Sequence, residues 1–91
     1  MHVVTVKVSI VDRERAEREL RERVVPMVSQ APGFIAGYWL EPQEGKGASF
    51  VVFESEEHAK AMVEGIEAQQ AQSDMPVTFD EVGVRGVIAH A

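Results

Sequence analysis

The sequence of 91 residues predicts a single α+β domain, residues 1–91, in which two helices cover one face of a four-stranded antiparallel sheet. The main observation is the spacing at which apolar residues recur. This spacing is typical, in order along the chain, of a strand, a helix, two strands, a helix and a strand. A second is the length, which is enough for one modest core. The third is that two short helices leave the other face of the sheet bare, and bare apolar faces mark interfaces. We therefore expect a homodimer formed through these open faces.

The first strand and the first helix are distinguished by the spacing of their aliphatic residues. Every second residue from Val4 to Ile10 is aliphatic, as in a strand with one buried face. Asp12 is placed to cap a helix, and aliphatic residues then recur at helical spacing as far as Val28. Pro26 lacks an amide donor, so we expect a kink or a separate last turn there.

Two strands and a second helix follow. The segments 34–40 and 48–53 are rich in aromatic and branched residues, and Pro42 and the Gly-Lys-Gly run 45–47 between them predict a hairpin loop. Ser55 is placed to cap the second helix. We expect this helix to pack beside the first one.

The end of the chain predicts a polar exit and a fourth strand. Residues 69–74 are mostly polar, and Val77–Ala89 has the alternation of a strand. Gly83 and Gly86 within it favour a bulge or a close backbone approach. In this topology the fourth strand is expected to neighbour the first.

Composition excludes several classes of function. The chain has no Cys, which removes disulfides, thiolate nucleophiles and cysteine metal sites. The net charge of −6 opposes binding to nucleic-acid phosphates or to anionic lipid. No apolar run approaches the roughly 20 residues of a membrane span, and the start has no signal-peptide pattern. We expect a cytoplasmic protein without nucleic-acid or membrane partners.

Charged residues on the strands are candidates for ligand or interface contacts. Lys7 has the parity opposite to the aliphatic residues of its strand, so it falls on the face that the dimer covers. Its ammonium would there hold an anionic ligand or form a salt bridge across the interface. The candidate bridge partners are Glu41, Asp80 and Glu81. Arg85 allows the same two interpretations.

The weak catalytic candidates are two aromatic residues and a histidine. Tyr38 and Trp39 are adjacent on a strand, so one faces the core or a pocket and the other faces the interface. Either ring can stack on a flat substrate and donate a hydrogen bond to an oxyanion, although plain packing is the simpler interpretation. His58 in the first turn of the second helix can act as a general base or lie on the surface. His2 and His90 have no third ligand, so we expect no metal site.

The chain resembles a known family in two runs. Residues 28–40, VSQAPGFIAGYWL, and 50–59, FVVFESEEHA, are similar to the antibiotic biosynthesis monooxygenase-like (ABM) family. The resemblance extends nearly end to end and implies a ferredoxin-like βαββαβ fold, a dimeric α+β barrel, and a pocket between each sheet and its helices. Active members include cofactor-free oxygenases of polycyclic phenols or quinols, and haem-degrading enzymes.

The resemblance also bears on haem degradation. Haem-degrading members share an Asn on the first strand, a Trp at the end of the third strand and a helical His. The matching positions here hold Lys7 and Phe53, and the chain has no Asn, so haem degradation is disfavoured.

Two functions remain open. One is a module that binds a small apolar or aromatic ligand, or that has a structural role; the other is a cofactor-free ABM-type monooxygenase acting on a phenol or quinol. We expect no cofactor in either case. The residues assigned to ligand or interface contacts are Lys7, Trp39, Phe53 and Arg85.

Overall fold

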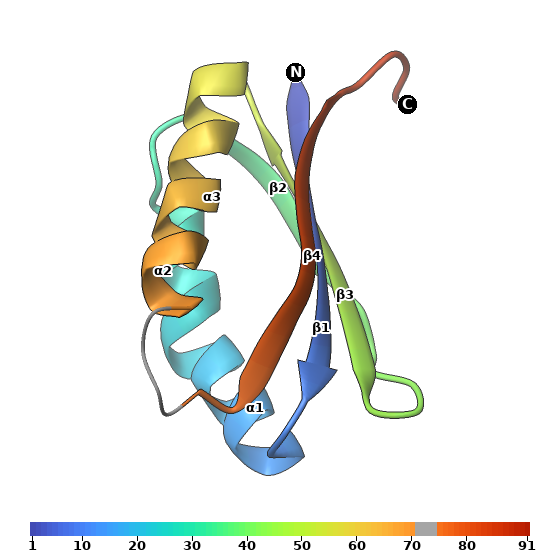
Figure 1. The fold of residues 1–91 in the computed structure, drawn as a ribbon. Coiled ribbons are helices and arrows are strands. Elements are labelled where there is room, and N and C mark those ends of the chain that lie inside the picture. Colours follow the sequence, from blue (N-terminus) through green and yellow to red (C-terminus); the bar gives the residue numbers. More distant parts are fainter. Residues whose placement is uncertain (71–74) are drawn as a thin grey trace.

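The chain folds into two layers, with the helices on one side of a four-stranded sheet (Figure 1). The computed structural model describes residues 1–70 and 75–91. The strands are β1 (His2–Ile10), β2 (Phe34–Trp39), β3 (Lys46–Phe53) and β4 (Val77–Gly86), in the order β2-β3-β1-β4, and each pairs antiparallel with its neighbours. The long helix α3 spans Glu56–Gln70. This is the predicted βαββαβ arrangement, with β1 and β4 side by side.

The first helix is divided into three pieces. They are α1 (Arg13–Glu19), a π-helical segment (Leu20–Val24) and α2 (Val25–Ser29). Asp12 caps α1, because its side chain accepts a hydrogen bond from the Arg15 amide. The wide turn precedes Pro26, whose ring would crowd the carbonyl four residues earlier in a regular helix. The predicted interruption at Pro26 is therefore confirmed.

The core lies between the sheet and the helices. In the centre of the sheet, Val4 of β1 is opposite Val51 of β3 and Val84 of β4, and all three point toward the helices. Val28 of α2 and Ile66 of α3 pack against this surface. The buried apolar residues are Val4, Val6, Val28, Val51, Phe53, Ala59 and Ile66.

The hairpin between β2 and β3 is tighter than expected. Glu44 and Gly45 have positive φ angles of 52° and 75°, and Gln43 pairs with Lys46. Two consecutive positive φ angles are typical of the type I′ turn that joins twisted strands. As a result β3 already begins at Lys46, two residues before the predicted start.

Two predictions for the end of the chain are wrong. The bulge lies at Asp80, where the register with β1 shifts, and not at the glycines. The strand stops at Gly86 because Gly86 pairs with His2, where β1 begins; Val87 makes one more bond to the Met1 carbonyl. Of the predicted polar exit, Gln69 and Gln70 belong to α3, and 71–74 lie outside the described residues. No helix in the described residues is long and apolar enough to span a membrane.

Candidate functional site

A cavity of about 910 Å³ lies between the helices and the sheet. Its floor is formed by residues of all four strands, and its walls by α1, the π-helical segment, α2 and α3. Most of the lining is aliphatic, including Val6, Val8, Leu20 and Met62. Ligand pockets have volumes of about 300–1,000 Å³, so this cavity is large enough for a polycyclic ligand.

Trp39 lines the cavity and Tyr38 does not. The indole lies along β2 over Gly37, where a Cβ atom would come within 2.7 Å of the ring. The Tyr38 side chain points to the other side of the sheet and is 60% exposed. The structure therefore decides which of the two aromatic residues faces the pocket, a question that the sequence left open.

His58 is held against the polypeptide at the start of α3. The hydroxyl of Ser55 lies 2.8 Å from His58 Nδ1 and also accepts a hydrogen bond of 3.3 Å from the His58 amide. The ring packs on Gly33, where a Cβ atom would lie 2.5 Å from the His58 Cγ atom. His58 lines the cavity and is half-buried, so it is more enclosed than the surface position that the sequence favoured.

Two further features of the lining were missed by the sequence analysis. Ser49 of β3 is 8% exposed, and among the described residues its hydroxyl has no hydrogen-bond partner. Gly65 of α3 lines the cavity, and a Cβ atom there would meet no atom within 4 Å. No sequence signal distinguishes either residue, because their roles depend on the gap between two layers.

Phe53 belongs to the core and to the wall of the cavity. It is 1% exposed and makes an edge contact with Phe34, with ring centroids 6.3 Å apart. It therefore lies on the helix side of the sheet and not on the open face.

The open face of the sheet has an apolar half. Tyr38 of β2 is paired with Phe50 of β3, and both side chains are exposed, at 60% and 41%. Val3 and Val52 lie opposite each other on the same face. The result is a contiguous apolar surface, which no layer covers in the part of the chain that the structure describes.

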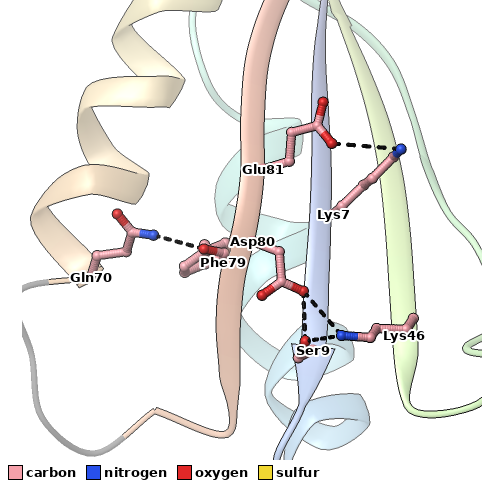
Figure 2. A network of polar contacts seen from close by, with 7 residues as sticks. All are labelled: Lys7, Ser9, Lys46, Gln70, Phe79, Asp80 and Glu81. Carbon is pink, nitrogen blue, oxygen red and sulfur yellow. Dashed lines mark hydrogen bonds and ion pairs between the residues drawn. The ribbon is translucent and has the colours of Figure 1, made fainter.

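The other half of the open face carries a polar network (Figure 2). Lys7 forms an ion pair of 3.6 Å with Glu81 on the neighbouring strand. Ser9 donates to Asp80 at 2.6 Å, and Lys46 reaches Ser9 and Asp80 at 2.6 and 3.7 Å. The bulge turns the Asp80 side chain to this face, beside the Glu81 side chain. Lys7 pairs with Glu81 of its own chain.

The remaining charged candidates are not part of the cavity lining. Arg85 is exposed on the open face, opposite Val3. His2 Nε2 lies 3.7 Å from Glu56, which also pairs with Lys60 at 3.0 Å. The hydrogen bond and charge of Lys60 lower the pKa of the Glu56 carboxyl. In the described part of the chain, no three His, Cys, Asp or Glu side chains gather as metal ligands do.

Comparison with known proteins relates the fold to haem-binding structures. One is a crystal structure of a mutant of MhuD with two manganese protoporphyrin IX bound per active site: 21% identity, TM-score 0.70, covering 100% of this chain and 98% of that one. Another is the heme-degrader MhuD from Mycobacterium tuberculosis with two hemes in its active site: 22% identity, TM-score 0.58, covering 98% of each chain. No family model matches the sequence, and no curated protein matches it significantly. The chain has the ferredoxin-like α+β fold of these structures, as the ABM resemblance implied.

Proposed function

We propose that the cavity between the helices and the sheet binds one or more flat, mainly apolar ligands of the porphyrin or polycyclic phenol class. The observation that carries this proposal is a cavity of about 910 Å³ that is lined mostly by aliphatic side chains and left unfilled by the described residues. Trp39 adds an aromatic surface on which a flat ring can stack. MhuD, which has the same fold, binds hemes and manganese protoporphyrin IX.

The lining suits a flat porphyrin, but it lacks the full set of residues that the haem-degrading members share. The single imidazole in the lining is that of His58. Lys7, at the position where haem degraders have Asn, points to the open face and pairs with Glu81. Binding of a planar ligand is therefore the proposal, and degradation of haem is not part of it.

Trp39 is the chain's one tryptophan, so its fluorescence tests the proposal directly. We expect protoporphyrin IX or 1,4-dihydroxynaphthalene to quench this emission in a saturable way. Gly65→Phe should fill the cavity from α3 and raise the dissociation constant by about tenfold or more, since it removes the space for the ligand.

Gly65→Ala is the matched control for that experiment. A methyl group at this position meets no atom and improves helix propensity, so we expect unchanged binding and a stability gain of about 0.5–1 kcal/mol. Linear, non-saturable quenching by both compounds would contradict the proposed binding role.

We further propose that two copies associate through the open faces of their sheets. The support is the exposed apolar half of this face together with the polar network beside it, which carries both signs of charge and can therefore complement a second copy. Such a dimer would enclose Tyr38, Phe50, Lys7 and Arg85, while both cavities would stay on the outside of the barrel.

A cofactor-free monooxygenase is the second candidate function. The observation that favours it is that the His58 imidazole and the Trp39 ring line the same cavity, which provides a hydrogen-bonding group near an aromatic wall. An oxygen electrode decides between the two functions. Oxygen uptake with 1,4-dihydroxynaphthalene that His58→Leu abolishes supports catalysis, whereas saturable binding without uptake leaves the binding role.

A further inference from the structure

The ring of His58 is held on one edge by two contacts. Nδ1 lies 2.8 Å from the Ser55 hydroxyl, and the Cγ edge of the ring packs on the backbone of Gly33. A side chain at residue 33 would collide with this edge, so the imidazole has little freedom to turn away. Its orientation is therefore set by the protein before any ligand arrives.

The proton balance of Ser55 favours one tautomer of His58. A hydroxyl has one proton to donate and two lone pairs. The Ser55 oxygen already accepts a hydrogen bond from the His58 amide. The hydroxyl proton of Ser55 is then donated to His58 Nδ1, which must be unprotonated to accept it. If Nδ1 were protonated instead, the oxygen would accept twice and its own proton would find no acceptor among the described residues.

The opposite edge of the ring faces outward from these contacts. Nε2 has no partner among the described residues, and it is not one of their buried unpartnered side-chain atoms. Since His58 lines the cavity and its other edge is held by Ser55 and Gly33, we expect a ligand there to reach this atom. Ser49 supplies a hydroxyl to the same lining.

We propose that Ser55 is a positioning residue that keeps the His58 proton on Nε2, so that the cavity presents an N–H donor to a ligand bearing an acceptor oxygen. The ligand class is a flat aromatic compound with a carbonyl or phenolate oxygen, such as a quinone or a phenol. This inference rests on the proposed ligand-binding function. It selects, within that class, oxygenated aromatic rings over pure hydrocarbons.

The tautomer can be measured without any ligand. Long-range ¹H–¹⁵N NMR spectra in mildly alkaline buffer report which nitrogen of each of the three histidines carries the proton. We expect Nε2–H at His58 in the parent chain and in Ser55→Thr, which keeps the hydroxyl. In Ser55→Asp the carboxylate still caps the helix but can only accept, so the proton should move to Nδ1. A proton on Nδ1 in the parent chain would overturn the inference.

The ligand class is tested with a matched pair of probes. We expect 2-methyl-1,4-naphthoquinone to bind more tightly than 2-methylnaphthalene, which has the same carbon skeleton without oxygen. His58→Leu should weaken binding of the quinone by about 3- to 10-fold and leave the hydrocarbon within about 2-fold, because one hydrogen bond is lost. His58→Gln keeps an N–H donor at a similar position and should restore quinone binding.

The outcomes separate the two proposals. If both probes bind and His58→Leu weakens them equally, the donor role is overturned and the cavity remains a binding site. If neither these probes nor the larger porphyrin binds, the proposed function fails and the ligand class fails with it. Quinone binding that is sensitive to His58 and to Ser55→Asp, but restored by His58→Gln and Ser55→Thr, supports both.

Discussion

Gly33→Ala is expected to destabilise the fold by about 2–4 kcal/mol, the largest effect that we predict for adding a single methyl group. Gly33 has a φ angle of 78°, a conformation that costs an L side chain about 1–2 kcal/mol. In addition, its Cβ would lie 2.5 Å from the His58 Cγ atom, so the imidazole would have to move. Urea denaturation followed by circular dichroism measures the loss.

The stability that Gly33→Ala loses through the clash with His58 can be separated from the stability that it loses through backbone strain. In the His58→Ala background the ring is absent, so Gly33→Ala should cost about 1–2 kcal/mol, the backbone strain alone. Gly45→Ala is the matched control for strain without contact, since Gly45 has a φ angle of 75° and no neighbour within 4 Å of its Cβ position. Equal costs for Gly33→Ala with and without the His58 ring would show that the contact does not exist in solution.

Phe50→Lys is expected to convert the proposed dimer into a monomer of 10.1 kDa, as measured by light scattering at micromolar concentration. Phe50 lies on the open face beside Tyr38 and between β1 and β2, so the change places an unpaired charge within the proposed contact. Leaving one charge unpaired in a buried contact costs about 3–5 kcal/mol, which raises the dissociation constant by at least about 100-fold.

Val11→Lys is the control for this change in association. Val11 is 70% exposed but follows β1 in the turn before α1, so the same substitution there adds charge away from the open face. We expect Val11→Lys to remain dimeric and both variants to keep the Trp39 emission, because the cavity lies on the other side of the sheet. A mass of one chain for the well-folded parent protein would rule out the dimer.

The fold could be predicted from local patterns in the sequence. Alternation in residues 4–10 identified β1 and its two faces, and Asp12 and Ser55 identified the starts of α1 and α3. These signals are local, since a strand's parity and a helix cap each depend on a few consecutive residues. The break at Pro26 was likewise predictable because it follows from the missing amide.

The site could be predicted only in part. Trp39 and His58 were candidates because of their side-chain chemistry, but their environments depend on residues distant in sequence. Gly33 and His58 are brought together because the α2–β2 connection packs on α3. Ser49 lines the cavity because the helices do not pack directly on the sheet at that point.

Local patterns in the sequence were enough to predict the order of the elements and the parity of β1, and the composition excluded thiolate chemistry and cysteine ligands. Contacts in the folded chain were needed to place Trp39 at the cavity, to pair Lys7 with Glu81 and to locate the bulge at Asp80. The physical reason is that periodicity encodes which side of an element is apolar, whereas register and the gap between layers arise from contacts across the whole chain.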